Sequence, residues 1–130
     1  GFLEMKTFKD LISGRGSKKL ISVAPTQTVS EAIEWMKKYE IENIPVFDGD
    51  NNIGAISESG LFNKILNNPG VKSELITSIM EKPYPEVAFD TPVERLSSFI
   101  TKENGAVLSK DESGSYHIVT KYDIIQSLSK

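Results

Sequence analysis

The apolar residues in the first part of the chain follow helical spacing before they change to the spacing of strands. Val29, Ile33 and Met36 recur as residues on one face of a helix do. Thr28 and Glu31 have the spacing of a capping box, in which each side chain accepts a hydrogen bond from the other residue's backbone N–H. The pattern therefore predicts an amphipathic helix that starts beside Thr28.

Short runs rich in β-branched and aromatic residues follow this helix. Residues 43–47 and 53–57 are separated by a stretch of Asp, Gly and Asn, which predicts a β-hairpin. Leu61 and Ile65 return to helical spacing, and the Asn-Asn-Pro-Gly run at 67–70 ends this second helix.

The second half of the chain repeats the plan of the first. Residues 106–109 and 116–120 predict another hairpin, and Ile124, Ile125 and Leu128 predict another closing helix. Identical residues occupy matching positions near the start of the two halves: Val23 and Val87, Ala24 and Ala88, Val29 and Val93.

A helix is also expected between the first strand and the hairpin of the second half. Thr91, Pro92 and Glu94 have the residue types of an N-cap, a first-turn proline and a third-position acid. Each half then has the order β-α-β-β-α. A unit of this size is too small to bury a stable core without metal or disulfides. We therefore predict an α/β (α+β) fold in which two repeats, about 7–68 and about 72–130, pack sheet to sheet as one module over 1–130.

Composition narrows the possible chemistry. The chain has 15 basic and 18 acidic residues, a net charge of −3, which disfavours nucleic acid as a partner. Cysteine is absent and His117 is the only histidine, so thiolate zinc sites and multi-histidine metal sites are excluded and no metal is expected. No apolar run approaches the roughly 20 residues that span a bilayer. We expect no membrane partner, no signal peptide and a cytoplasmic location.

Two short motifs, in the order found here, resemble those of the tandem CBS-domain pair, or Bateman module. They are Asn-Ile-Pro-Val at 43–46, which enters the first hairpin, and Thr-Lys-Tyr-Asp at 120–123, which fits the pattern Ser/Thr-x-x-Asp. Residues 80–85 and 118–125 look most like the C-terminal regulatory region of a bacterial cystathionine β-synthase.

The resemblance implies a pseudo-twofold module with two clefts for adenosyl ligands: AMP, ATP or S-adenosylmethionine. Binding would be allosteric and would control an attached or partner enzyme, here a PLP-dependent cystathionine β-synthase. The fragment itself would hold no cofactor and catalyse no reaction, and it would form a homodimer. A ligand-free structural or autoinhibitory dimerisation domain is the alternative.

The first cleft, cleft A, would bind the ribose through Thr120 and Asp123, because a carboxylate can accept both protons of a vicinal diol. The same two residues also have the spacing of a helix cap, and the two roles can coexist. The family pattern implies the following residues for cleft A: Thr120, Asp123, Ile118, Ser22, Ile21, Ile41, Asn43 and Ile44.

The second cleft, cleft B, is predicted to be weak or empty. The position that matches Asp123 is Gly60, which has no side chain to hold a diol. The family pattern implies the following residues for cleft B: Ser57, Val87, Asn104 and Ala106.

The sequence leaves two alternative roles for His117 and for a small basic cluster. His117 could contact a phosphate or sense pH, but a water-facing position on an edge strand is the more common role of such a residue. Arg15, Lys18 and Lys19 could contact a phosphate or simply form a solvated basic surface.

Overall fold

The computed structural model describes residues 6–14 and 20–128, which form two compact units. Unit 2 is Ile21–Tyr84, and unit 1 combines Gly1–Leu20 with Pro85–Lys130. The N-terminal helix is therefore part of the unit that contains the second hairpin. These units divide the chain differently from the sequence repeats at about 7–68 and 72–130, whose boundaries stay a prediction.

Unit 2 begins with an extended segment and the helix α2, Val29–Tyr39. The capping box predicted at its start is confirmed. The Thr28 hydroxyl accepts from the backbone N–H of Glu31 at 3.3 Å, and the Glu31 carboxylate accepts from the backbone N–H of Thr28 at 3.4 Å. These two bonds pair N–H groups that have no partner within the helix.

The predicted hairpin of unit 2 is also confirmed. Its strands are β1, Asn43–Asp48, and β2, Asn51–Ser57, which pair antiparallel with Ile44 opposite Ile56. Val23 extends this pairing on the other edge of β1 through a parallel bridge to Val46.

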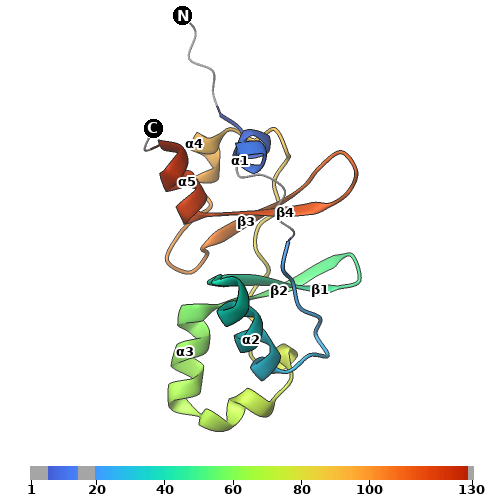
Figure 1. Cartoon of the computed structure of the whole chain (residues 1–130), viewed down its shortest axis with the longest axis vertical. Helices are drawn as coiled ribbons and strands as arrows, with labels where there is room; N and C mark the ends of the chain where they lie inside the picture. Colours follow the sequence, from blue (N-terminus) through green and yellow to red (C-terminus); the bar gives the residue numbers. More distant parts are fainter. Residues whose placement is uncertain (1–5, 15–19, 129–130) are drawn as a thin grey trace, which may run out of the picture. The chain divides into compact units, whose positions relative to one another are not determined.

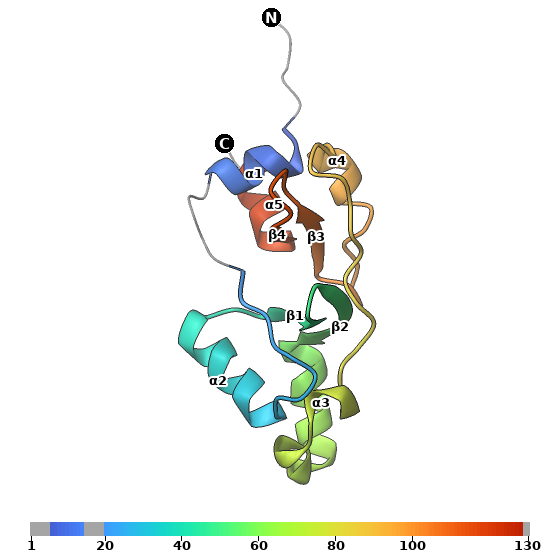
Figure 2. The ribbon, with the colours of Figure 1, turned by 90° about the vertical axis from the view of Figure 1, so that its right-hand side faces the viewer.

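The remaining elements of unit 2 are α3, Glu58–Asn67, and the 3₁₀ helices η1, Pro69–Ser73, and η2, Ile76–Ser78. Helices α2 and α3 lie on the same face of the β1–β2 hairpin (Figures 1 and 2). The buried residues packed between them are Val23, Val29, Ala32, Met36, Ile44, Val46, Ile56, Leu61, Val71, Ile76 and Ile79.

Unit 1 is built around the second predicted hairpin, β3, Ala106–Lys110, and β4, Tyr116–Thr120. Helices α1, Phe8–Gly14, and α5, Lys121–Leu128, cover one face of it (Figures 1 and 2). Its core residues are Phe8, Leu11, Val93, Leu96, Val107, Val119 and Ile124.

The helix predicted to start at Pro92 with Thr91 as its cap is present, but it is short and its cap is different. Helix α4 comprises only Val93–Leu96, and Pro92 is its N-cap, with ψ 145°, rather than its first helical residue. The Thr91 hydroxyl does not cap the helix, because it donates to the carbonyl oxygen three residues earlier at 2.6 Å. The hydroxyls of Ser97 and Ser98 also bond local carbonyl oxygens, both at 2.7 Å, which competes with helix continuation.

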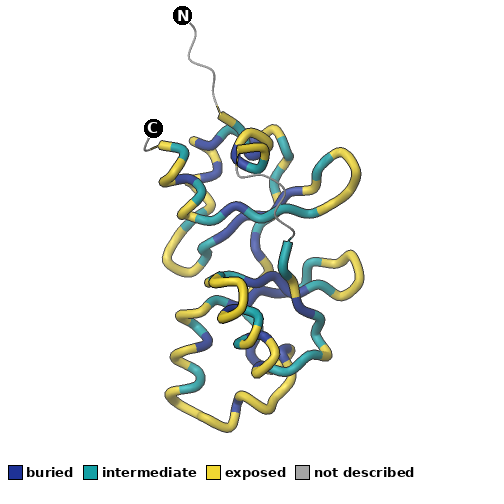
Figure 3. The backbone as a smooth tube through the Cα atoms, viewed as in Figure 1, coloured by how far each residue is buried: buried dark blue, intermediate teal, exposed yellow. Residues whose placement is uncertain are grey.

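Burial follows these layers within each unit. Strands β1, β2 and β3 each contain a run of buried residues, whereas much of α3 and α5 is exposed (Figure 3). In the part of the chain that the structure describes, no helix has both the length and the apolar character needed to cross a membrane.

Candidate functional site

Thr120 and Asp123 lie at the junction between β4 and α5 in unit 1. The backbone N–H and the hydroxyl of Thr120 both donate to Oδ2 of Asp123, at 2.9 Å and 3.2 Å. This is the acid half of a capping box, in which the carboxylate accepts from the backbone N–H of the residue before the helix, so the suggested cap is present in part. The same bonds hold a half-buried carboxylate in a defined position beside the first turn of α5.

The third cleft A residue of unit 1 precedes this junction. Ile118 is half-buried on β4, opposite Leu108 of β3. The structure therefore places Ile118, Thr120 and Asp123 within one strand-to-helix segment.

The other cleft A residues belong to unit 2. Ile21 is half-buried and Ser22 is exposed, both in the extended segment before the parallel bridge. Ile41 packs at the margin of the core, and Ile44 is completely buried within it, so the Ile44 side chain stabilises unit 2. The assignment of these residues to one ligand with Thr120 stays a prediction.

Asn43 is held by a buried tyrosine. The Tyr84 hydroxyl donates to Oδ1 of Asn43 at 3.0 Å and to the backbone oxygen of Ile56 at 3.4 Å. Burial and the nearby negative charge of Glu81 both raise the pKa of Tyr84, which keeps the phenol protonated as a donor.

The side chain of Glu81, which sequence reasoning missed, lies beside the start of α3. Ser57, the N-cap of α3, accepts from the backbone N–H of Gly60 at 3.1 Å and donates to Oε1 of Glu81 at 3.1 Å. A Cβ at position 60 would overlap this carboxylate oxygen. Glu81 therefore places a carboxylate beside Ser57 where Gly60 provides none, and the weak or empty state of cleft B stays a prediction.

The remaining cleft B residues lie in unit 1. The backbone N–H of Val87 donates to Leu108 at 2.9 Å, and the side chain of Asn104 donates to the Phe99 carbonyl at 2.6 Å. Ala106 is completely buried at the start of β3. All three residues therefore have packing or hydrogen-bonding roles within unit 1, and a ligand role stays a prediction for each of them.

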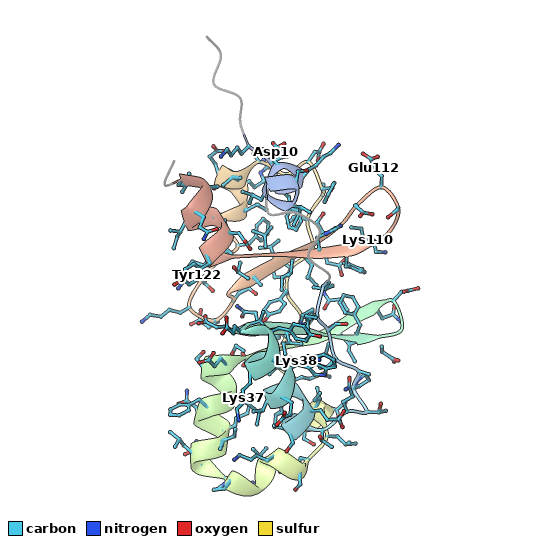
Figure 4. All side chains as sticks on the ribbon, viewed as in Figure 1. Asp10, Lys37, Lys38, Lys110, Glu112 and Tyr122 are labelled. Atoms are coloured by element: carbon cyan, nitrogen blue, oxygen red, sulfur yellow. The ribbon has the colours of Figure 1, made fainter. Side chains whose placement is uncertain are left out.

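The side chain of His117 has protein contacts, so it differs from the water-facing position on an edge strand that is the more common role of such a residue. Its Nε2 lies 2.8 Å from Oδ2 of Asp111, and its ring is tilted against Phe89 with centroids 5.7 Å apart. The hydrogen bond from His117, followed by bonds from Ser113 and Ser115, lowers the pKa of Asp111. The cluster ties β4 to the loop between Lys110 and Tyr116 (Figure 4 labels Lys110).

The basic cluster and the possible metal ligands are the remaining candidate groups. Arg15, Lys18 and Lys19 lie outside the described residues. Among residues 6–14 and 20–128, no three acidic or histidine side chains are grouped so as to hold a metal ion.

Comparison with known proteins identifies the fold. The family model for the CBS domain matches residues 9–67. No curated protein sequence matches the chain. A solved CBS-domain protein from Agrobacterium tumefaciens, ATU1752, is similar with a TM-score of 0.84 and 19% identity, over 98% of each chain.

Two further solved structures contain adenine-based ligands. The CBS domain pair of protein MJ0100, in complex with 5′-methylthioadenosine and S-adenosyl-L-methionine, has a TM-score of 0.79 and 23% identity, covering 97% of this chain and 98% of that one. CBSX2 in complex with AMP has a TM-score of 0.70 and 17% identity, covering 95% and 96%. Residues 9–67 therefore match the model of the CBS-domain family, and over nearly its whole length the chain has the fold of solved CBS-domain proteins.

Proposed function

We propose that this chain is a regulatory module that binds an adenosyl ligand, namely AMP, ATP or S-adenosylmethionine. The observation that carries the proposal is the Thr120–Asp123 pair, a positioned carboxylate at the start of a helix. Solved proteins of the same fold, in complex with AMP or with S-adenosyl-L-methionine, support the choice of ligand class.

The chemistry of the pair suits a nucleoside. An ionised carboxylate accepts hydrogen bonds only, so it recognises the two hydroxyl protons of a ribose. The first N–H groups of α5 point toward the same end of the helix and favour a negatively charged ligand group nearby. Asp123 would bind the diol, and Thr120 would hold Asp123 in place.

Regulation requires a partner, and exposed apolar residues suggest where it binds. Helix α3 exposes Phe62 and Leu66, and α5 exposes Tyr122, Ile125 and Leu128 (Figure 4 labels Tyr122). We propose that these faces form the interface of a cytoplasmic homodimer. The host enzyme proposed from the sequence resemblance is a cystathionine β-synthase, which ligand binding would control through different affinities for two module shapes.

A second candidate is a dimerisation domain that binds no small molecule. The observation that favours it is that Asp123 already has a structural role as a capping residue. In that case the exposed faces of α3 and α5 would carry the whole function.

Isothermal titration with AMP, ATP and S-adenosylmethionine separates the two candidates. Asp123→Asn is the sharpest variant, because an amide oxygen can still accept from Thr120 while the negative charge is lost. We expect about 10-fold to 100-fold weaker binding, since removing a charged hydrogen-bond partner costs about 1.5–3 kcal/mol. Absence of heat and of any thermal shift at millimolar ligand would refute the sensor proposal and leave the dimerisation domain.

A further inference from the structure

Asn104 and Gly105 lie in the loop between α4 and β3 of unit 1 (Figure 1). Theirs is the only Asn-Gly sequence in the chain. The side-chain amide carbon of an asparagine can meet the backbone nitrogen of the next residue, and a glycine at that position has no Cβ to hinder the approach. This pair is therefore the place where the backbone is least hindered from attacking an asparagine side chain.

The backbone nitrogen of Gly105 is not held by the fold. Gly105 is half-buried and directly precedes β3, so it lies outside the hydrogen-bonded ladder of β3 and β4. Within residues 6–14 and 20–128, the Gly105 N–H donates to no backbone carbonyl oxygen. An attack by this nitrogen thus breaks no backbone hydrogen bond.

The side chain of Asn104 is restrained by a single hydrogen bond. Its Nδ2 donates to the Phe99 carbonyl oxygen at 2.6 Å, and this bond is exposed to solvent. The bond holds the amide in one orientation, so the fold restrains an approach to Gly105 that an unfolded chain permits freely. Exposed hydrogen bonds in loops open often, so the restraint slows a reaction at Asn104 without preventing it.

We propose that Asn104 is a site of spontaneous covalent modification, at which water converts the asparagine to aspartate and isoaspartate. In the first step the Gly105 nitrogen bonds to Cγ of Asn104, and the bond from Cγ to Nδ2 breaks. The leaving nitrogen takes up the proton that Gly105 loses and departs as ammonia. The chain then carries a cyclic succinimide.

Water opens this ring in the second step. Hydrolysis of the bond between the ring nitrogen and Cγ gives aspartate and restores the ordinary backbone. Hydrolysis of the bond between the nitrogen and the backbone carbonyl carbon gives isoaspartate, in which the main chain runs through Cγ. The net reaction consumes one water and releases one ammonia, so it needs no ligand and does not depend on the proposed function.

The products change how the loop enters β3. An ionised aspartate accepts hydrogen bonds only, so it cannot replace Nδ2 as the donor to the Phe99 carbonyl. Isoaspartate also lengthens the main chain by a methylene group close to Ala106, which is completely buried at the start of β3. Both products should loosen β3 in unit 1 and leave unit 2 unchanged.

Peptide mapping of the full chain after storage at neutral pH tests the site. Trypsin cuts after Lys102 and Lys110, so Asn104 is the only asparagine in the peptide 103–110. We expect the two products to form there about 10-fold faster or more than at any other asparagine, because each of the others precedes a residue with a Cβ. These other asparagines are Asn43, Asn51, Asn52, Asn63, Asn67 and Asn68.

Gly105→Ala is the decisive variant, since it adds a Cβ to the attacking residue and should slow the reaction about 10-fold or more. The described glycines with left-handed φ are Gly49 and Gly114, so alanine at position 105 meets no backbone strain. Gly14→Ala is the matched control, because a Cβ there meets open space, and it should leave the rate at Asn104 unchanged. Urea should speed the reaction in the wild type, because unfolding releases the Asn104 side chain from Phe99.

Amide hydrogen exchange of the stored chain and of Asn104→Asp measures the structural consequence. Protection should fall in β3 of both samples and stay at the wild-type level in β1 and β2. Absence of product in the peptide 103–110 after weeks of storage, or equal rates in the wild type and Gly105→Ala, would overturn the inference. The wild-type comparison decides by itself if Gly105→Ala does not fold. A converted chain that keeps full protection in β3 would overturn the proposed effect on unit 1.

Discussion

Replacing Phe8 with alanine should unfold unit 1 while unit 2 keeps its structure. Phe8 is completely buried in the core of unit 1, and its ring lies 5.8 Å from that of Phe89. Its backbone N–H donates to the Thr91 carbonyl at 2.9 Å, which ties α1 to the segment before α4. The residue thus tests whether the first helix completes the unit formed by the second half of the chain.

The size of the effect follows from burial. Truncation of a fully buried phenylalanine to alanine costs about 3–5 kcal/mol, because it removes apolar contacts and leaves a cavity. A whole small protein is stable by only about 5–15 kcal/mol. The loss at Phe8 is therefore a large share of the stability available to unit 1.

Amide hydrogen exchange read separately for each hairpin measures the outcome. Protection should fall in β3 and β4, and it should stay near the wild-type level in β1 and β2. Leu75→Ala is the control, because Leu75 is 48% exposed, lies outside the proposed dimer interface, and its loss should change stability by about 0.5 kcal/mol or less. Loss of protection in β1 and β2 instead, or a cost as small as that of the control, would refute the assignment of α1 to unit 1.

Three further predictions concern single hydrogen-bonded groups. Thr28→Ala removes the cap of α2 and should lower the free energy of unfolding by about 1 kcal/mol in urea titrations; no change would show that the Glu31 contact suffices. Tyr84→Phe should cost about 1–3 kcal/mol in the same assay, because it leaves a buried acceptor without its donor; a neutral result would mean that water replaces the hydroxyl. The pKa of Asp111 is lower in the folded chain, so the stability that this carboxylate adds is present above its ordinary pKa near 3.8 and is lost as pH falls below that value. Urea midpoints from pH 6 to pH 2 should therefore fall more steeply in the wild type than in Asp111→Asn, and parallel curves would contradict the pairing with His117.

Elements with local signals were predictable from the sequence. The capping box at Thr28 and both hairpins depend on residues close together in the chain, and all were confirmed. The short length of α4 was not predictable in this way. The hydroxyls of Ser97 and Ser98 bond local carbonyl oxygens, and helix-start signals do not report this competition.

Contacts between distant segments were not predictable in the same way. Glu81 reaches Ser57 through a bridge to β2, and the segment that carries Glu81 has no motif that marks it as part of a site. Likewise, Phe8 and Leu11 have helical spacing, but nothing in that spacing tells which hairpin they cover. A ligand role for Asp123 stays a prediction, because its hydrogen bonds to Thr120 are compatible both with ribose binding and with a purely structural role.

The division of the chain between the units has a consequence for protein synthesis. Helix α1 is translated before unit 2, yet it packs against β4, which is translated after unit 2. All of unit 2 lies between them in the chain, so it can fold on the ribosome while Phe8 and Leu11 still lack their partners. The nascent chain therefore carries an uncovered apolar helix while unit 2 is translated, and chaperones that bind such segments have an opportunity to act during that interval.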